Sequence, residues 1–464
     1  MAIAAQASGC GTVCSGRQPN CEDRYASARV AVHEGGRWQE VRAVWVNADA
    51  QVRGRLDDGS RWSVAELEGL LVFGQPDVGR VTLAHLPRGE EQLSELVEKE
   101  WDAPTLEFGA SLAAGPAAEE EPWDLWVGSP GAGADAGALA LFRDGATAGP
   151  DPDLLLRANS PGDRLGTAMA RCADLTGDGR AEWLAAAPRY SPPLDDEPSA
   201  ESANLAGAVF LLESERFDPL TGEQDVRDAA RVWWGDVVGQ GVGTSLTCAH
   251  DITGDGVADV VVGAPWYGSE REGSVFVLSG AGLPNAGPIG SVATRQIVGI
   301  ESEGWFGVSL VVADFDADGR ADLAVGAPGS RGGTGSVLLY GGEDLASDAR
   351  QIAPRTTFDL RDREPGRHLG RFVTSGDIDG NRIPDLLVGA PDWALPNAHD
   401  AGRLFIWQGG PTWAGTEIAG EDNQRAVEGG RPYQRVGRTA LFVDLDGDGD
   451  DELLLPTRDR STTR

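Results

Sequence analysis

The sequence predicts an all-β protein, a seven-bladed β-propeller whose blades are four-stranded antiparallel sheets. The first observation is a repeat in which an acidic loop precedes a short apolar run, with starts at Asp174, Asp251, Asp314, Asp377 and Asp444. The second is the spacing of these starts, 63 to 77 residues, which is typical of an array of similar units. The third is that a full repeat contains four short strand-like runs, the pattern of a propeller blade.

The unit that begins at Phe306 shows the expected order of strands. A first strand covers Phe306–Val312, and the acidic loop leads into a second strand at Leu323–Ala327. A Gly-rich connection precedes a third strand in GSVLLYGG, and a fourth is expected near Thr357–Leu360. Because the second strand is apolar and ends in Gly-Ala-Pro, we expect it to be buried and to end in a turn.

A glycine precedes each acidic loop at a nearly constant distance. The dipeptides are Leu165-Gly166, Val242-Gly243, Phe306-Gly307, Leu369-Gly370 and Val436-Gly437. Since glycine has no Cβ, these positions are expected to allow neighbouring backbones to approach closely. Two earlier units lack the acidic loop, one around Phe108-Gly109 and one around Leu70–Pro76, which brings the number of units to seven.

The last unit contains only two predicted strands. Two runs near the N-terminus, Ala26–His33 and Glu40–Val46, are predicted to form a hairpin that supplies the other two strands. This pairing would close the ring and leave no open radial edge. We therefore predict a tail at residues 1–24, one propeller domain at residues 25–456 and a second tail at residues 457–464, with the chain a monomer.

The acidic loops predict up to five Ca²⁺ sites. Positions one, three, five, seven and nine of a tight loop place oxygen ligands around a hard cation. The predicted ligands are Asp174, Thr176, Asp178, Arg180 and Glu182; Asp251, Thr253, Asp255, Val257 and Asp259; Asp314, Asp316, Asp318, Arg320 and Asp322; Asp377, Asp379, Asn381, Ile383 and Asp385; and Asp444, Asp446, Asp448, Asp450 and Glu452. The fourth loop is expected to be the weakest, because Asn381 replaces a carboxylate and Arg382 stands where glycine is usual.

A helix-loop-helix calcium motif is the main alternative for these loops. Such a motif requires Glu at position twelve, where this chain has Ala185, Val262, Val325, Val388 and Leu455. The flanking segments are also rich in strand-forming residues, so the propeller interpretation is favoured.

Composition excludes some partners. The chain has 39 basic and 73 acidic residues and a formal net charge of -34. This balance argues against nucleic acid and against an anionic membrane surface, both of which require clustered Lys and Arg. No apolar run is long enough for a transmembrane helix.

The five cysteines leave several arrangements open. Ala7-Ser8-Gly9-Cys10 looks like the end of a bacterial lipobox, so Cys10 is a candidate lipid anchor. The remaining four could pair as Cys14 with Cys21 and Cys172 with Cys248, or all could be free thiols. The signal segment itself is not visible, and an extracellular or cell-surface location is expected.

These motifs resemble the FG-GAP repeat family, which includes the seven-bladed propellers of integrin α-subunits. The resemblance covers about Ala26 to Pro456. It implies that the cation loop joins strands one and two on one face and that ligands bind on the opposite face.

Two functions from different classes remain. The first is non-catalytic binding of a protein or glycan, as in adhesion, for which aromatic residues just after the turns are candidates: Tyr190, Trp266, Tyr267 and Trp393. The alternative, that these rings pack around the channel mouth, is favoured over ligand binding. The second is a hydrolase or lyase with an unrecognised site in the channel or on the face opposite the calcium loops. No known catalytic motif is present, so we predict that the chain is not an enzyme.

Overall fold

The structure of this chain is a computed structural model. It describes residues 26–34, 37–46, 63–67, 70–76, 79–85, 97–103, 107–118, 121–145, 147–158, 160–191, 205–248, 250–347, 352–360, 365–396, 398–411, 415–419, 425–429, 432–433, 435–443 and 451–456.

The described strands form seven sheets, which we number in chain order, and four of these sheets have four strands. Sheet 1 contains β3 (Ser63–Leu67), β4 (Leu70–Gln75), β5 (Arg80–His85) and β6 (Val97–Asp102). Sheet 4 contains β16 (Ser245–Thr247), β17 (Val260–Ala264), β18 (Ser274–Leu278) and β20 (Arg295–Val298). Sheet 6 contains β25 (Phe372–Gly376), β26 (Asp385–Ala390), β27 (Arg403–Trp407) and β29 (Arg425–Glu428). Sheet 7 contains β30 (Leu441–Val443), β31 (Glu452–Pro456), β2 (Arg37–Val46) and β1 (Ala26–Glu34).

The other three sheets have a fifth strand at the outer edge. Sheet 2 contains β7 (Ser111–Pro116), β8 (Trp123–Ser129), β9 (Ala138–Phe142), β10 (Leu154–Arg157) and β14 (Gly222–Asp225). Sheet 3 contains β11 (Met169–Arg171), β12 (Trp183–Ala187), β13 (Ala208–Leu212), β15 (Ala230–Trp234) and β19 (Ala286–Pro288). Sheet 5 contains β21 (Ser309–Ala313), β22 (Asp322–Ala327), β23 (Ser336–Tyr340), β24 (Thr356–Leu360) and β28 (Gly415–Ala419).

The described helices are single turns in the connections between strands. They are α2 (Ala132–Asp135), α3 (Ser214–Phe217), α4 (Val226–Ala229), α5 (Ile289–Val292), α6 (Ser330–Gly333) and α7 (Gly342–Leu345). Within the described part of the chain, no helix has the length and apolar character needed to cross a bilayer. The prediction of an all-β fold is confirmed.

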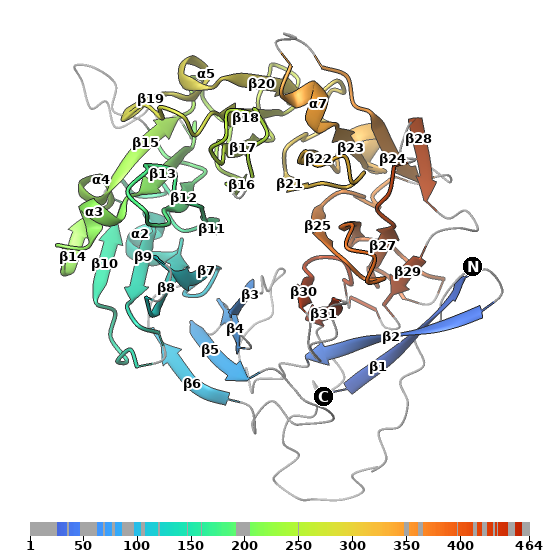
Figure 1. Cartoon of the computed structure of the whole chain (residues 1–464), viewed down its shortest axis with the longest axis horizontal. Coiled ribbons are helices and arrows are strands. Elements are labelled where there is room, and N and C mark those ends of the chain that lie inside the picture. Colours follow the sequence, from blue (N-terminus) through green and yellow to red (C-terminus); the bar gives the residue numbers. More distant parts are fainter. Residues whose placement is uncertain are drawn as a thin grey trace, which may run out of the picture.

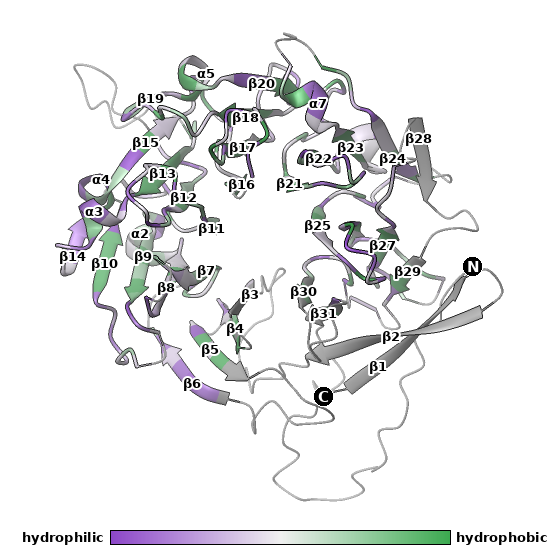
Figure 2. Ribbon diagram, in the orientation of Figure 1, coloured by the Kyte–Doolittle hydropathy of each residue, from purple (hydrophilic) through white to green (hydrophobic). Residues whose placement is uncertain are grey.

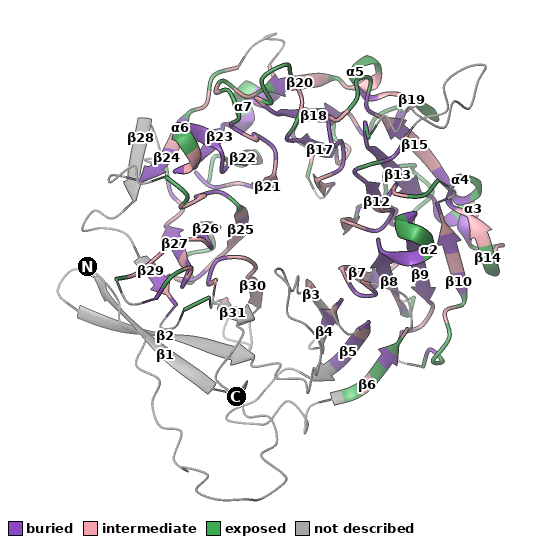
Figure 3. Ribbon diagram, turned by 180° about the vertical axis from the view of Figure 1, so that it is seen from behind, coloured by how far each residue is buried: buried purple, intermediate pink, exposed green. Residues whose placement is uncertain are grey.

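The sheets are arranged around a common centre, with the first strand of each sheet innermost (Figure 1). Successive first strands contact one another, and β30 of the last sheet contacts β3 of the first. Strands β17, β18, β22 and β23 are largely apolar (Figure 2), and all four are buried along their whole length (Figure 3). A strand buried on both faces reads as a continuous apolar run, which is why LAVGA and VVVGA are so regular.

The predicted close approach of backbones at the glycines is confirmed. Gly370, with φ 83°, lies against Gly326 of the preceding sheet, and a Cβ added to Gly326 would stand 2.0 Å from the Gly370 carbonyl oxygen. Ser309 Oγ donates a 2.7 Å hydrogen bond to the same carbonyl. Equivalent serine bonds are made by Ser63, Ser111 and Ser245. Four of the five glycines before the acidic loops thus dock onto a turn glycine of the neighbouring sheet, and the fifth, Gly243, lies against Ala186.

The prediction of uniformly four-stranded antiparallel sheets is wrong in two respects. First, β14, β19 and β28 pair in parallel with the outermost strands of sheets 2, 3 and 5. Each comes from the connection between the third and fourth strands of the next sheet along the chain: β14 from sheet 3, β19 from sheet 4 and β28 from sheet 6. The outer strand of a sheet has unpaired main-chain groups, and these added strands satisfy them.

Second, the N-terminal hairpin joins the last sheet in the opposite direction from that expected. The hairpin itself is confirmed, since β1 and β2 are antiparallel. However, β2 pairs with β31 in parallel. No short turn connects β2 to β31 along the chain, so nothing local imposes an antiparallel pairing.

Candidate cation sites and the opposite loop face

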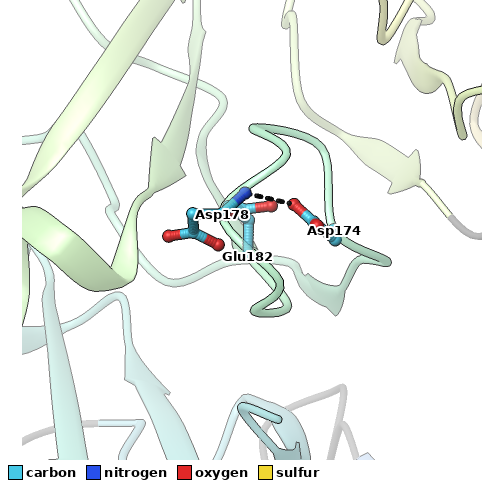
Figure 4. A group of neighbouring side chains, drawn as sticks. All are labelled: Asp174, Asp178 and Glu182. Carbon is cyan, nitrogen blue, oxygen red and sulfur yellow. Dashed lines mark hydrogen bonds between the residues drawn. The ribbon is translucent and has the colours of Figure 1, made fainter.

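Four of the five acidic loops lie within the described residues, and each joins the first strand of a sheet to the second. In every one, three carboxylates place oxygen atoms within 4.8 Å of one another. The groups are Asp174, Asp178 and Glu182; Asp251, Asp255 and Asp259; Asp314, Asp316 and Asp322; and Asp377, Asp379 and Asp385. Figure 4 shows the first group, in which the Glu182 side chain lies between those of Asp174 and Asp178 and the Asp178 main-chain N–H is bonded to Asp174.

One hydrogen-bond pattern shapes all four loops. In the first, Asp174 accepts main-chain N–H bonds from Asp178 at 3.2 Å and Gly179 at 2.8 Å, and Asp178 accepts one from Arg180 at 2.8 Å. The corresponding bonds recur in the loops that begin at Asp251, Asp314 and Asp377. These bonds fold the main chain into a tight turn and so bring the side chains together.

The carboxylate at position nine anchors each loop to the core. Glu182, Asp259, Asp322 and Asp385 are all fully buried or nearly so. Each accepts the main-chain N–H of the residue at position two: Leu175 at 2.6 Å, Ile252 at 2.8 Å, Phe315 at 3.0 Å and Ile378 at 3.1 Å. The strand that follows is therefore fixed relative to the loop.

Burial makes these anchors costly to ionise. It raises the pKa of Glu182 and of Asp385 to about 7 and that of Asp322 to about 6, and it also raises the pKa of Asp259. Neighbouring carboxylates add to the increase at Glu182, Asp322 and Asp385, since like charges oppose ionisation. A cation between the carboxylates would remove both penalties.

The loops differ in their other ligands. In the third, Asp316 rather than Asp318 completes the group, and Arg355 forms an ion pair with it. In the first and second, the hydroxyls of Thr176 and Thr253 donate to the position-nine carboxylates at 2.9 Å and 3.1 Å. These threonines therefore support the anchor.

The fourth loop departs furthest from the common pattern. Arg382 adopts φ 66°, the left-handed conformation that Gly179, Gly256 and Gly319 adopt at the same position. One carboxylate oxygen of this loop, Asp379 Oδ1, is buried without a hydrogen-bond partner. An unpaired buried oxygen beside two other carboxylates fits a cation ligand.

The residues present fit calcium. Carboxylate, hydroxyl and main-chain oxygens are the ligands that a hard cation takes, and the loops contribute no sulfur or imidazole within the groups described. The fifth loop, Asp444, Asp446, Asp448 and Asp450, lies outside the described residues, and so does the side chain of Glu452.

A disulfide lies next to the first two loops. Cys172 and Cys248 are bonded and buried, and they join sheet 3 to sheet 4. Of the arrangements left open by the sequence, the pairing of these two cysteines is the one observed. Cys10, Cys14 and Cys21 lie outside the described residues, so the lipid anchor and the second pair stay predictions.

Comparison with known proteins agrees with these features. The FG-GAP repeat family model matches residues 242–278, 306–340 and 369–407. The chain contains FG-GAP repeats. Each matched segment runs from the glycine that docks on the preceding sheet, through a cation loop, to the third strand.

Curated relatives share part of this repeat region. Integrin alpha-7 of Rattus norvegicus is 32% identical over 219 residues, which cover 45% of this chain and 18% of that protein. Phosphatidylinositol-glycan-specific phospholipase D of Homo sapiens is 34% identical over 186 residues, which cover 38% of this chain and 21% of that protein. The chain thus matches about a fifth of the length of these relatives.

The FG-GAP repeats define a second face, which we call the loop face. It is formed by the connections from second to third strands and from each fourth strand to the next sheet. Because successive strands are antiparallel, these connections lie at the opposite end of the sheets from the cation loops.

Three of the four aromatic residues predicted to bind a ligand pack against a buried phenylalanine; Tyr190 is buried, and Tyr267 and Trp393 are half-buried. Tyr190, Tyr267 and Trp393 contact Phe210, Phe276 and Phe405 in edge-to-face geometry, with ring centroids 5.5, 5.9 and 5.7 Å apart. Arg367 also lies 4.2 Å from the Trp393 ring. Edge-to-face pairs of this kind stabilise the turn. Trp266 is exposed, as a ligand contact would require.

Aliphatic residues that the sequence reasoning did not select are exposed on the same face. All large hydrophobic side chains found exposed in the described residues lie on or at the ends of loop-face connections: Leu205, Val237, Val238, Trp266, Val298, Ile300 and Tyr433. The Trp266 main-chain N–H donates to the Gln240 carbonyl at 3.2 Å, and Glu303 N–H donates to the Glu270 carbonyl at 2.7 Å. The connections that carry Val237, Trp266 and Ile300 are therefore neighbours.

Proposed function

We propose that this chain is a non-catalytic recognition protein, a seven-bladed β-propeller that calcium stabilises and that binds a protein or glycan on its loop face. The observation that carries the proposal is the separation of the two faces. Among the described residues, the clusters of three carboxylates lie at one end of the sheets, and the exposed large apolar side chains lie at the other.

The propeller is supported by the arrangement of the sheets. Seven sheets surround a common centre, and the first strands contact one another in order. The contact of β30 with β3, together with the pairing of β2 with β31, supports a ring closed by the N-terminal strands.

Calcium binding is supported by the four carboxylate groups and by the oxygen without a partner at Asp379. Bound ions would neutralise the position-nine anchors and join the first two strands of each sheet. The role of calcium is therefore structural, and the fifth loop would add one more site.

Recognition of a protein is favoured over that of a glycan by the residues exposed. Val237, Val238 and Ile300 are 59%, 62% and 77% exposed, and the connections that carry them are neighbours, as a contiguous apolar interaction patch requires. Aliphatic patches suit protein partners, and aromatic platforms suit sugars. A role in adhesion follows if the partner lies on a cell surface.

The disulfide supports an extracellular or cell-surface location. Disulfides persist in oxidising compartments, and the Cys172–Cys248 bond is buried between two sheets. A bacterial lipoprotein anchored through Cys10 is consistent with such a location.

The test is a protein and glycan array probed in the presence of calcium. The variant Val237→Ser, Val238→Ser, Trp266→Ala should lose binding to any specific partner, and its melting temperature should stay within about 1 °C of the native value. Glu343→Ala, an exposed change at the cation-loop end, is the matched control and should bind normally. If the triple variant binds as well as the native chain, the loop-face assignment is wrong.

A hydrolase is the second candidate, and one contact favours it. His368 Nδ1 lies 2.7 Å from Asp392 Oδ2 on the loop face, the geometry in which a carboxylate orients a general base. The match to a phospholipase D gives this alternative a substrate class to test. Turnover of phosphodiesters that is lost in His368→Ala would establish it, and no turnover would reject it.

A further inference from the structure

A pocket opens on the loop face between sheets 4 and 5. Its cavity volume is about 70 Å³, and it opens to solvent at its rim. Its walls include Glu272, Ile300, Glu301, Phe306, Ser330 and Leu338. They come from the β17–β18, β20–β21 and β22–β23 connections and from strand β23.

Ser330 occupies a position that holds an aromatic residue in three other sheets. The glycine just before the third strand donates its N–H to the carbonyl of this residue in each sheet. The bonds are Gly207 to Tyr190 at 3.1 Å, Gly273 to Tyr267 at 2.9 Å, Gly335 to Ser330 at 3.0 Å and Gly402 to Trp393 at 2.9 Å. The same main-chain hydrogen bond is thus made at all four positions, although Ser330 begins the helical turn α6 and the other three residues lie in non-helical connections.

The phenylalanine that contacts this aromatic ring in the other sheets is also absent from sheet 5. Phe210, Phe276 and Phe405 pair with Ala185, Val262 and Val388 of the second strands. In sheet 5 the corresponding residue, paired with Val325, is Leu338. Sheets 3, 4 and 6 therefore fill this space with an edge-to-face pair of their own, and sheet 5 has a pocket there. In sheet 2 the two positions hold Ala132 and Ala140, which are both buried.

We propose that this pocket receives an aromatic side chain of the protein partner, tyrosine above all, in the place that Tyr267 takes in sheet 4. The inference rests on the proposed role of the loop face in protein recognition. In sheets 3 and 4 a tyrosine ring packs at the corresponding position. A ring supplied by a partner would pack on Phe306 and Leu338 and be covered by Ile300 at the rim.

The charges around the pocket favour a neutral hydrogen-bond donor over an acidic group. Glu272 and Glu301 are both in the wall. Arg331, the cation of the pocket, is paired with Asp359 at 2.7 Å, so its charge is already balanced. A phenol hydroxyl can donate to a glutamate, and a carboxylate of a partner would be repelled.

The experiment uses N-acetyl-tyrosinamide as the probe with the whole chain in calcium. Ligand-observed NMR and calorimetry should show one site with a dissociation constant on the order of 1 mM, as expected for a fragment of this size. In Ser330→Tyr the new ring should fill the pocket, weaken probe binding at least tenfold and raise the melting temperature. The matched variant Tyr267→Ser should open a second site in sheet 4.

Several results would overturn the proposal. They are no binding to the native chain, equal binding to a folded Ser330→Tyr variant, or tighter binding of N-acetyl-leucinamide or N-acetyl-argininamide than of the tyrosine probe. Ser330→Ala, which removes the hydroxyl and leaves the space, should keep probe binding. Since the probe needs no natural partner, a negative result here leaves the array experiment unaffected, and a glycan partner in the array leaves this result standing.

Discussion

The two ends of the sheets differ in how regular they are. At the cation-loop end, four loops repeat one hydrogen-bond pattern and one buried anchor with little variation. On the loop face, the connections vary in length, carry exposed Val237, Trp266 and Ile300, and line the pocket at Ser330, where the pattern of the sheets is broken. The cation loops are alike because each of them joins the same two strands of its sheet and so stabilises the array in the same way. Irregularity is what recognition of one partner requires.

Among single substitutions, removal of a buried position-nine carboxylate should lower the free energy of unfolding most. Asp322 accepts the N–H groups of Phe315 at 3.0 Å and Gly342 at 2.8 Å and is 1% exposed. Asp322→Ala would leave two buried donors unpaired, and we expect it to lower the free energy of unfolding by about 3 kcal/mol. Denaturant unfolding in calcium measures this, and calorimetry should show one bound calcium fewer. A change below about 0.5 kcal/mol, the range of the Glu343→Ala control, would contradict the anchor role.

Because of the position-nine carboxylates, the melting temperature should depend on pH in opposite directions with and without calcium. Their pKa values are raised by burial, to about 7 for Glu182 and Asp385 and to about 6 for Asp322. A carboxyl whose pKa is higher in the folded state contributes stability at low pH and loses it as pH rises through the folded value. In EDTA, the melting temperature should therefore fall between pH 5 and pH 8.

With calcium present, the opposite trend is expected over the same range, because the ion binds the ionised carboxylates. Calcium affinity should weaken as pH falls below about 7. Melting curves at several pH values, with and without EDTA, test both statements. Parallel pH profiles in the two conditions would show that these carboxyls do not bind the ion.

The smallest effect is expected at position six of the loops. Arg382 has φ 66°, and a residue with a side chain pays about 1 kcal/mol for this conformation relative to glycine. Arg382→Gly should therefore stabilise the chain by about 1 kcal/mol. Gly319→Ala, the matched change at φ 85° with open space around it, should destabilise it by a similar amount. Shifts of the same sign in both variants would refute the backbone explanation.

Features set by short-range patterns could be predicted from the sequence. The loop ligands follow from the one, three, five, nine spacing, and the docking of Gly370 on Gly326 follows from two glycines that recur at fixed places. Both depend on residues within one repeat or at the same place in the next. The second strands were recognisable because they are buried on both faces.

Features that depend on pairing between distant segments could not be predicted. GEQD and AGP carry no strand pattern, and β14 and β19 form because an outer strand offers unpaired main-chain groups. Tyr190 and Tyr267 were candidates for exposure because their partners, Phe210 and Phe276, lie on strands whose register was unknown. The substitution of Ser330 for a ring was visible in the aligned repeats, but its consequence needed the structure.

The central claim is that the cation-loop end holds the fold together and the loop face does not. It is tested most directly by the melting temperature of the native chain in excess calcium and in EDTA. With free calcium at about ten times each dissociation constant, four sites contribute about 6 kcal/mol, so EDTA should lower the melting temperature by roughly 7 °C or more. The loop-face triple variant should show the same difference. An unchanged melting temperature in EDTA would contradict the structural role of the loops.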